Sequence, residues 1–275
     1  MKPAPVTLVI AAKNCEDRIE GTIKPWLGRV EAIMVVDEMS SDQTAGRARS
    51  LGAEVIVQAA PGENFDRNRK AGMLKAKTPW ILYLDTDERP TPALLSEFSE
   101  FFANAEANAD DKEAVAPRVQ GVRIPNDFYF LGKKLTRGIY NPKSAEIRLF
   151  RRESYDYPCE EGFHRGISVR GEVVRFKNSY RHFNVNTLSE WFIKTNQYTE
   201  VDALAHQGQP AQPRTLVWRA FKFFCKYYGI KQGFRDGVHG FLSVTYFMLY
   251  HFTLGFKIWE KQLLKTKKIE EDYLP

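Results

Sequence analysis

The chain has 275 residues, of which 43% are hydrophobic and 27% charged, a composition that indicates a folded globular protein and excludes a disordered or collagen-like one. Its formal net charge of +6 favours anionic partners such as nucleotide phosphates, lipid headgroups or nucleic acid, without choosing among them. The three cysteines, at positions 15, 159 and 225, are too few and too scattered for a disulfide framework or a zinc site, and they indicate free thiols in a reducing compartment.

Apolar runs and helical patterns alternate along the first hundred residues. Runs typical of buried strands occupy 6–12, 32–36, 54–58 and 80–84, and the segments between them have helical spacing. The first run is too short for the core of a secretory signal peptide, so we expect a strand there, with Asn14 as the cap of the next helix. Strands and helices that alternate in this way predict a largely parallel sheet in a nucleotide-binding α/β half.

Acidic residues follow two of these runs directly: Asp37 after the second, and Asp85, Asp87 and Glu88 after the fourth. The carboxyl ends of parallel strands are where open α/β sheets bind ligands. Carboxylate oxygens in this position can hold Mg²⁺ or Mn²⁺ on a diphosphate, and Asp37 can bind a base or a ribose. The alternatives are a solvated acidic turn before a helix capped by Thr91, and for Asp37 a favourable interaction with a helix dipole.

Two common phosphate-binding signatures are missing from the sequence. The first strand is followed by AAKNCED, which is no G-x-G-x-x-G fingerprint, and the chain contains no G-x-x-x-x-G-K-[ST] loop. A dinucleotide-binding Rossmann domain and a P-loop nucleotide hydrolase are therefore both disfavoured.

Several segments in a fixed order carry a family resemblance. In the nucleotide-binding half they are VTLVIAAKNCEDR (6–18), VVDEMSSDQT (35–44), RNRKAG (67–72) and LYLDTDERP (82–90). Further along they are FLGKKLTRG (130–138), IRLFRR (147–152) and GFRDGVHGF (233–241). Together they resemble the family 2 glycosyltransferases, and within these the bacterial branch, described as β-1,4-glucosyltransferase-like, that adds sugars to the inner core of lipopolysaccharide.

The resemblance implies an α/β fold of the GT-A type, a Rossmann-like nucleotide-diphospho-sugar transferase, with a C-terminal helical extension. It implies a nucleotide-sugar donor, with a preference for uridine, and a Mg²⁺ or Mn²⁺ ion held by Asp87 and Asp85, with His182 completing the shell. The donor contacts that it implies come from Ala11, Asn14, Asp37, Arg67, Asp85 and Thr86. Two positions depart from the family pattern: Cys15 and Arg165 stand where glutamate is usual.

The catalytic base is expected in YDYPCEEGFHR (155–165). Inverting transfer needs one carboxylate to deprotonate the acceptor hydroxyl, whereas the metal and cations stabilise the leaving diphosphate. Glu160 and Glu161 are the candidates, with Asp156 third; the family position of the acidic residue places Glu161 first. His164 is assigned to the acceptor.

Aromatic and cationic residues interleave between 128 and 137, and Arg137 is the acceptor residue that we select there. Stacking and basic contacts of this kind suit a sugar-phosphate acceptor. Nucleic acid could use such a surface, and a covered strand with extended lysine side chains is the simpler alternative.

The last third reads as helical. Thr187-x-x-Glu190 is a capping box, and residues 216–231 mix aromatic and cationic side chains. Residues 237–256 carry no formal charge and reach the length of a membrane span, but their histidines, glycines and tyrosines favour a helical pair that lies in the membrane interface. A packed helical subdomain or a dimer contact is the alternative.

The predicted organisation is a catalytic domain at 1–185 and a helical extension at 186–275. Within the former, 1–100 binds the nucleotide sugar and 101–185 supplies the base and the acceptor site. The function expected is inverting, metal-dependent transfer of a sugar to a cell-envelope glycolipid such as lipopolysaccharide core, by an enzyme bound peripherally to the cytoplasmic face of the inner membrane, with no nucleic-acid partner. A nucleotidyltransferase, or a catalytically impaired nucleotide-sugar-binding module at the membrane surface, is the alternative.

Overall fold

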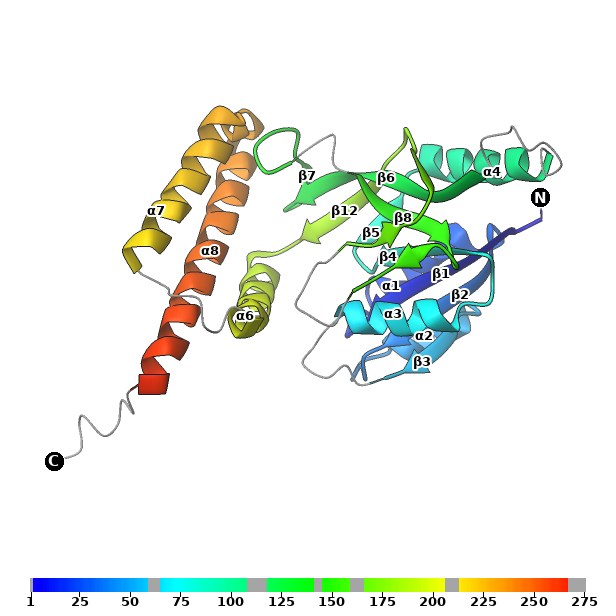
Figure 1. The fold of residues 1–275 in the computed structure, drawn as a ribbon, viewed down its shortest axis with the longest axis horizontal. Helices are drawn as coiled ribbons and strands as arrows, with labels where there is room; N and C mark the ends of the chain where they lie inside the picture. The colour runs from blue at the N-terminus through cyan, green and yellow to red at the C-terminus, as the bar shows by residue number, and fades with distance from the viewer. Residues whose placement is uncertain are drawn as a thin grey trace. The chain divides into compact units, whose positions relative to one another are not determined.

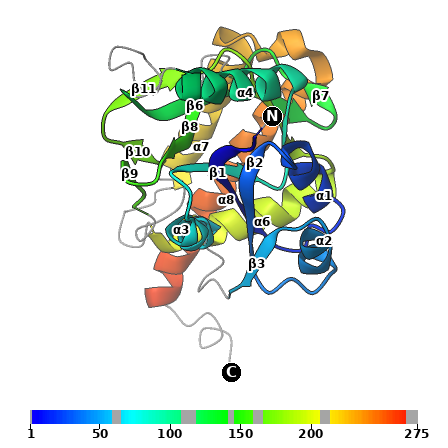
Figure 2. The same ribbon diagram turned by 90° about the vertical axis from the view of Figure 1, so that its right-hand side faces the viewer.

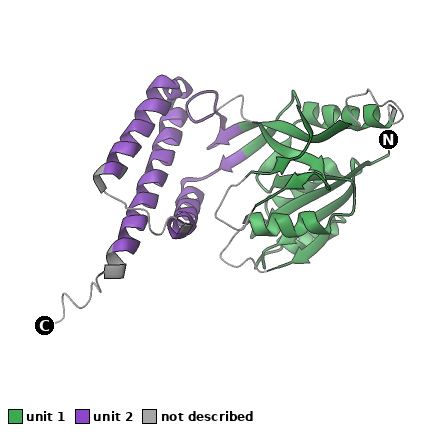
Figure 3. Cartoon of the chain, viewed as in Figure 1, with its two compact units in different colours: residues 1–127, 142–160, 164–182 green, residues 128–141, 161–163, 183–275 purple. Residues whose placement is uncertain are grey.

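The computed structural model describes residues 2–58, 65–107, 118–140, 145–158, 166–205 and 213–266. The chain forms two compact units, coloured green and purple in Figure 3. Unit 1 comprises residues 1–127, 142–160 and 164–182, and unit 2 comprises residues 128–141, 161–163 and 183–275. The predicted boundary at residue 185 between a catalytic domain and a helical extension stays a prediction about function.

Four parallel strands form one half of the sheet in unit 1 (Figure 1). They are β1 (Ala4–Ala12), β2 (Val30–Asp37), β3 (Glu54–Val57) and β4 (Trp80–Asp85), in the order β3-β2-β1-β4. Each coincides with one of the four predicted strands, and every neighbouring pair is parallel. Strand β1 lies in the middle and is buried along nearly its whole length, which explains its continuous apolar sequence.

Mostly antiparallel strands complete the sheet. The order continues from β4 through β8 (Ala145–Arg151), β6 (Val119–Phe130) and β12 (Tyr180–Val185) to β5 (Glu88–Pro90). The pairs β4–β8, β8–β6 and β12–β5 are antiparallel. Of the short strands, β7 (Lys133–Lys134) pairs with β6 antiparallel and β11 (Glu172–Arg175) pairs with it in parallel. Strands β9 (Tyr155–Asp156) and β10 (Ser168–Val169) form a separate antiparallel pair. The sheet is therefore mixed, with the parallel half formed by the first hundred residues.

Helices cover both faces of the parallel half (Figure 2). On one face lie α1 (Ile19–Ile23), the 3₁₀ turn η1 (Lys24–Trp26), α2 (Thr44–Ser50) and α4 (Pro92–Ala107), and on the other lies α3 (Phe65–Lys75). The alternation along β1 sends Leu8 and Ile10 into the first core and Val9 into the second, as the period of a strand requires. Helix α3 approaches β1 closely, because a Cβ on Gly72 would lie 2.6 Å from a methyl carbon of Val9.

The ends of two helices test the predicted caps. Thr91 caps α4 as expected, since its Oγ1 accepts a hydrogen bond from Leu94 N at 3.2 Å. The predicted cap at Asn14 is wrong. Helix α1 begins only at Ile19, and Asn14 adopts a positive φ of 45°, which asparagine tolerates better than most residues. Its Oδ1 accepts from Ser41 N at 2.9 Å, so it ties together the loops after β1 and β2.

Unit 2 is largely helical. It contains α6 (Leu188–Ala205), α7 (Pro213–Phe224), the π turn η2 (Cys225–Ile230), the 3₁₀ turn η3 (Gly233–Asp236) and α8 (Gly237–Thr266). Thr187 caps α6 as predicted, with Glu190 N donating to Thr187 Oγ1 at 3.1 Å. Helix α8 packs against both α6 and α7 (Figure 1). A core cluster in this unit joins strands to helices: Phe130, Leu135, Val185, Trp191 and Tyr246.

The uncharged run at 237–256 forms the first two thirds of α8. Within the described part of the chain, no helix is both long enough and apolar enough to cross a bilayer.

Candidate functional site

Three acidic positions meet at the carboxyl edge of the parallel sheet in unit 1. In the strand register, Ala12 of β1 lies opposite Asp37 of β2, and Ala11 lies opposite Asp85 of β4. The two aspartates therefore flank the end of β1, and Asp87 follows in the turn between β4 and β5. Parallel pairing alone produces this arrangement, as the sequence predicted.

Asp37 is buried, and one of its carboxylate oxygens has no hydrogen-bond donor among the described residues. Its Oδ2 accepts a hydrogen bond from Ser40 N at 3.1 Å, and its side chain is almost completely buried. Among the described residues, no donor reaches its Oδ1. A buried acceptor that stays unsatisfied costs about 1–3 kcal/mol, so this oxygen is suited to a hydrogen-bond donor on a bound molecule.

Asp85 is held by two arginines. Arg69 of α3 donates to Asp85 Oδ1, and Arg148 Nη1 lies 3.7 Å from its Oδ2. Burial by itself would raise the pKa of Asp85, but the guanidinium groups of Arg69 and then Arg148 outweigh it and lower the pKa. The carboxylate is therefore charged and already largely neutralised by protein cations, which leaves it less available to a metal.

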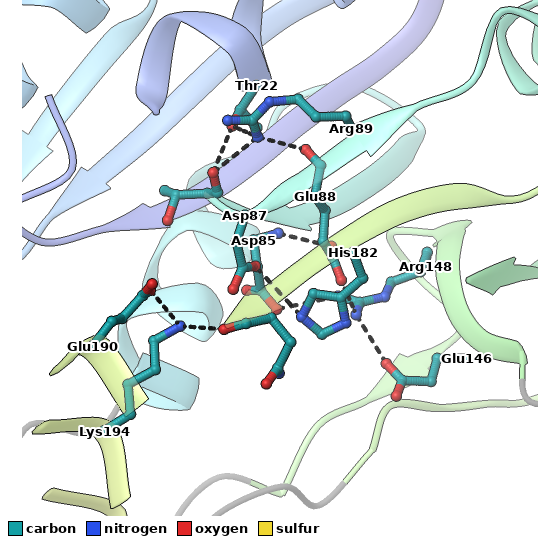
Figure 4. Close-up of polar contacts among 12 residues, drawn as sticks. Thr22, Asp85, Asp87, Glu88, Arg89, Glu146, Arg148, His182, Glu190 and Lys194 are labelled. Carbon is teal, nitrogen blue, oxygen red and sulfur yellow. Dashed lines mark hydrogen bonds and ion pairs between the residues drawn. The ribbon is translucent and has the colours of Figure 1, made fainter. Parts of the chain in front are cut away.

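Glu88 and Arg148 form a buried ion pair beneath these residues (Figure 4). Arg148 Nη2 donates to Glu88 Oε1 at 2.7 Å, and Glu88 Oε2 accepts from Asp85 N at 2.9 Å. The guanidinium carbon of Arg148 also lies 4.4 Å from the ring centre of Tyr83. Burial raises the pKa of Glu88 to about 7 although Arg148 opposes the shift. The pair fixes the backbone at the start of the Asp-x-Asp turn.

Asp87 and His182 lie side by side (Figure 4). Strand β12 pairs with β5 so that His182 stands opposite Glu88, and His182 Nε2 lies 3.6 Å from Asp87 Oδ1. Burial lowers the pKa of His182, but the carboxylate of Asp87 outweighs burial and the pKa is raised to about 9. One carboxylate and one imidazole are thus brought together from positions 95 residues apart.

The donor set at Asp87 fits a metal that is shared with a substrate. Among the described residues, no group of three His, Cys, Asp or Glu side chains could hold a metal ion. Asp87 and His182 together offer one oxygen and one nitrogen, and Mg²⁺ and Mn²⁺ sites often use only one or two protein ligands together with substrate phosphates. The chemistry of this pair is compatible with such an ion, provided that the metal displaces the proton that Asp87 stabilises on His182. Of the three predicted ligands, Asp85 is the least available, because Arg69 and Arg148 already contact its carboxylate.

Arg89 braces the turn that carries the Asp-x-Asp residues. Its Nη1 donates to Thr22 Oγ1 at 2.6 Å and to the carbonyl oxygen of Thr86 at 2.8 Å. Its Nη2 donates to the carbonyl oxygen of Arg18 at 2.8 Å. The carbonyl oxygen of Thr86 also accepts from Thr22 Oγ1 of α1 at 3.1 Å. The Thr86 side chain, predicted to contact the donor, is half-buried.

Helix α3 presents Arg69 rather than Arg67 to the acidic edge. Arg67 is exposed, whereas Arg69 Nη1 donates to Asp66 Oδ1 at 2.7 Å and its Nη2 reaches Asp85. Asp66 also accepts from Tyr157 Oη at 2.5 Å. Arg67 remains a prediction for donor binding, and Arg69 is a residue at the site that sequence reasoning did not select.

Cys15 lies buried behind the loop after β1. Its amide donates to Thr44 Oγ1 at 2.8 Å. Burial raises the pKa of its thiol to about 11, against weaker opposing hydrogen bonds from Thr44 and Thr86. The residue that stands in place of the usual glutamate is therefore a protonated packing group.

The other predicted residues are not part of this edge as the structure describes it. Glu160, Glu161 and His164 lie outside the described residues, as does Arg165. Arg137 belongs to unit 2, where it is exposed. The base and the acceptor contacts therefore stay predictions.

The arginines at 69, 89 and 148 are the residues of the edge that sequence reasoning missed; Glu88 was included in the predicted acidic cluster, but its pairing with Arg148 was not foreseen. A weak signal was available for one of them: Arg148 stands between Ile147 and Leu149 in an otherwise buried strand, and a buried arginine requires a partner.

Comparison with known proteins agrees with this architecture. The family model described as "Glycosyl transferase family 2" matches residues 7–170. The lipopolysaccharide core biosynthesis glycosyltransferase LpsC of Rhizobium meliloti (strain 1021) is 25% identical over 98% of this chain and 97% of its own length. An uncharacterized glycosyltransferase of Rickettsia conorii (strain ATCC VR-613 / Malish 7) is 24% identical over 98% of this chain and 94% of its own length.

Solved structures show more distant likeness. Residues 1–349 of S. aureus TarS align with 98% of this chain and 93% of theirs, at 12% identity and a TM-score of 0.45. Glucosyl-3-phosphoglycerate synthase from Mycobacterium tuberculosis, in complex with Mn²⁺, uridine diphosphate and glucosyl-3-phosphoglycerate, aligns with 73% of this chain and 78% of its own, at 17% identity and a TM-score of 0.40. Since the family model covers more than half of the sequence, from the first strand to beyond β10, this chain belongs to glycosyl transferase family 2.

Proposed function

We propose that this glycosyltransferase moves a sugar, with inversion, from a uridine-linked nucleotide sugar to a cell-envelope glycolipid of the lipopolysaccharide-core type. The observation that carries the proposal is the edge of unit 1, where the buried, unsatisfied Oδ1 of Asp37 lies across the end of β1 from the Asp-x-Asp turn. The similarity to LpsC, a lipopolysaccharide core biosynthesis glycosyltransferase, supports the acceptor class.

Asp37 would bind the nucleoside. Its unsatisfied oxygen would accept a hydrogen bond from a base N–H or a ribose hydroxyl, and Ser40 N holds its other oxygen in place. Ala11, at the end of β1, and Asn14 and Thr86, in the loops beyond β1 and β4, would line the donor site beside this carboxylate.

Asp87 and His182 would hold the metal together with the diphosphate. Asp85, which is ion-paired with Arg69, would be a weaker ligand. A divalent ion bound there supplies positive charge for the leaving nucleoside diphosphate. Arg69 and Arg148 keep the pKa of Asp85 low, so its carboxylate stays deprotonated. Because the bound ion would stabilise the leaving diphosphate, no general acid is needed on that side.

The acceptor side is assigned to the second half of the chain. Glu161, or Glu160 next to it, would take the proton from the acceptor hydroxyl as that oxygen attacks the anomeric carbon. His164 and Arg137 would bind the acceptor. Because a glycolipid acceptor resides in a bilayer, the enzyme would work peripherally at the cytoplasmic face of the inner membrane.

Donor binding provides the first test. Isothermal titration with UDP-, GDP- and CMP-sugars, with and without Mn²⁺, should show binding of a UDP-sugar that the metal strengthens. Asp37→Ala should weaken that binding about tenfold or more, the value of a hydrogen bond to a charged group. Glu54→Gln, an exposed acidic residue on β3, is the matched control and should bind as the wild type does.

Transfer provides the second test. Incubation with the bound donor and purified truncated lipopolysaccharide cores should add one sugar, detected by mass spectrometry. Glu161→Gln should bind donor but transfer no sugar. Binding of a nucleoside triphosphate with release of diphosphate would instead indicate a nucleotidyltransferase, and donor binding without transfer to any core would indicate a binding module.

A further inference from the structure

Three apolar side chains project into solvent at the turn between α7 and α8. Residues 229–241, here called the hairpin tip, contain Ile230, Phe234 and Val238, whose exposed fractions are 78%, 51% and 69%. Exposed apolar side chains that gather in one place mark a surface that binds something. Their exposure is not explained by a loosely packed loop, because hydrogen bonds and close backbone packing hold the tip in one conformation.

A buried aspartate holds the tip in shape. Asp236 Oδ2 accepts from the amides of Thr136 and Arg137, each at 2.9 Å, and Oδ1 accepts from Thr136 Oγ1 at 2.7 Å. Gly138 N donates to the carbonyl oxygen of Lys231 at 3.0 Å, and Lys133 Nζ donates to the carbonyl oxygen of Asp236 at 3.0 Å. The loop at 131–138 and the hairpin tip thus form one hydrogen-bonded body inside unit 2.

The backbone of the tip is packed without space for side chains. A Cβ on Gly240 would lie 1.9 Å from the carbonyl oxygen of Gly233, and a Cβ on Gly233 would lie 2.8 Å from that of Tyr227. Gln232 and Gly237 take positive φ angles of 59° and 65°. The turns are therefore tightly constrained, and the apolar side chains between them are held outward.

Cationic side chains accompany the apolar ones. Residues 213–241 contain six lysines and arginines and a single acidic residue, Asp236, which is buried. Lys231 and Arg235 of the tip are exposed, and so is Arg137, which Asp236 ties to the tip. No formal negative charge therefore faces solvent in this segment to offset the cations.

We propose that the hairpin tip docks this protein on an anionic lipid bilayer, end-on. Ile230, Phe234 and Val238 would enter the boundary between headgroups and acyl chains, and Lys231, Arg235 and Arg137 would contact anionic headgroups. A rigid group of apolar side chains accompanied by exposed cations matches both parts of a bilayer surface. Aliphatic side chains such as Ile230 and Val238 offer little to a nucleic acid, which binds through aromatic stacking and phosphate contacts.

The assignment deepens the proposed function, since a glycolipid acceptor would place the enzyme at a membrane. It names the surface that makes the contact. It also differs from the arrangement expected from sequence, in which the two helices lie flat in the interface.

Vesicle flotation of the full-length protein tests the assignment. We expect binding to phosphatidylcholine vesicles that contain about 30% phosphatidylglycerol, and much weaker binding to vesicles of phosphatidylcholine alone. Binding to the anionic vesicles should be lost at high salt, because salt screens the charges. Ile230→Ser/Val238→Ser should weaken binding at least about tenfold, because both aliphatic side chains would lose their burial in the bilayer. Lys231→Gln/Arg235→Gln should weaken it about tenfold or more, because two cations would lose their attraction to anionic headgroups.

Matched controls come from unit 1. Leu74→Ser replaces a side chain that is 70% exposed on α3, and Arg49→Gln removes an exposed cation on α2; both should bind vesicles as the wild type does. Circular dichroism and thermal melting of every variant establish folding, and the charge pair tests the tip even if the apolar pair proves unstable.

The assignment would be overturned if the wild type failed to bind anionic vesicles at low salt, or if both tip variants bound like the wild type. Analytical ultracentrifugation that showed a dimer abolished by Ile230→Ser/Val238→Ser would assign the tip to a second copy instead. Transfer to a water-soluble acceptor saccharide separates the two proposals. If it persists without vesicle binding, only the docking assignment fails; vesicle binding without transfer leaves docking intact and removes the proposed function.

Discussion

Arg148 is enclosed by Glu88, Asp85 and Glu146 and lies over the rings of Tyr83 and Tyr180. Arg148→Met should lower the free energy of unfolding by about 3–5 kcal/mol, because it leaves the fully buried Glu88 without its cation. Chemical denaturation measures the loss.

A double variant provides the control for Arg148. Arg148→Met/Glu88→Gln should recover part of the stability, because neither residue then carries an uncompensated charge. The exposed Lys177→Met should change the free energy of unfolding little. A single Arg148 variant as stable as the wild type would mean that the ion pair contributes nothing to the fold.

The cysteines should differ sharply in reactivity. Because burial raises the pKa of Cys15 to about 11, its thiolate fraction at about pH 8 is on the order of one in a thousand, and the side chain is also inaccessible. Cys225 is exposed. Iodoacetamide should therefore modify Cys225 rapidly and Cys15 only after denaturation, as peptide mass spectrometry would show. Rapid modification of Cys15 in the native protein would contradict its placement.

Metal binding at the edge should depend on Asp87 and His182 more than on Asp85. In the presence of uridine diphosphate, Asp87→Asn and His182→Ala should each weaken Mn²⁺ binding at least about tenfold, as expected for loss of one ligand or its immediate support. Asp85→Asn should weaken it less, since Arg69 and Arg148 already occupy that carboxylate. Electron paramagnetic resonance of bound Mn²⁺ provides the measurement, and an Asp85 variant with the largest loss would reverse the ranking.

At the scale of elements, the parallel half could be predicted from sequence because its information is local. Each of its strands is an apolar run, and the register of parallel neighbours places Asp37 and Asp85 together once the strands are identified. Arg148 could not be assigned in this way. Its role depends on β8 pairing with β4, more than sixty residues away in the chain, and no local pattern reports that pairing.

The prediction that Asn14 caps a helix failed for the same reason: contacts with a distant segment, which no local pattern reports, decide the outcome. Asparagine after a strand favours a helix start by local preference, but contacts with Ser40 and Ser41 in the next loop determine its conformation. His182 was selected through the family resemblance rather than through any pattern in SYRHF. Its approach to Asp87 requires β12 to pair with β5.

The close contact of α3 with the sheet predicts that alanine is tolerated less well at Gly72, in that contact, than at Gly46 on α2. Gly72→Ala should destabilise the protein by about 1–3 kcal/mol, because the new methyl would lie 2.6 Å from Val9 and 2.9 Å from Val36 in a packed core. Gly46→Ala on α2 would meet only the flexible end of Gln43, at 3.0 Å, and should be neutral or stabilising by up to about 1 kcal/mol. Thermal melting of both variants tests the pair, and equal effects would contradict the close approach.

At the scale of the whole molecule, each of the two units is formed by segments that are separated in the sequence. Phe130 and Leu135 belong to the same core as Trp191 and Tyr246, so removal of residues 186–275 would expose that core. We expect a 1–185 fragment to aggregate or to elute as a large species in size-exclusion chromatography, whereas the full chain should not. A monomeric, folded fragment would show that residues 128–141 are stable without the helices.

The division of the chain also bears on how such enzymes could exchange parts. Unit 2 takes residues 128–141 from the middle of the sequence and 183–275 from its end, and Asp236 binds one segment to the other. A chimera with a single crossover near residue 185 would join the helices of one parent to residues 128–141 of another. Asp236 would then have to bind the amides of a loop from the other parent. A transplant that is to carry surface properties between relatives must therefore move both segments together, so recombination at one point is a poor route to new variants of this architecture.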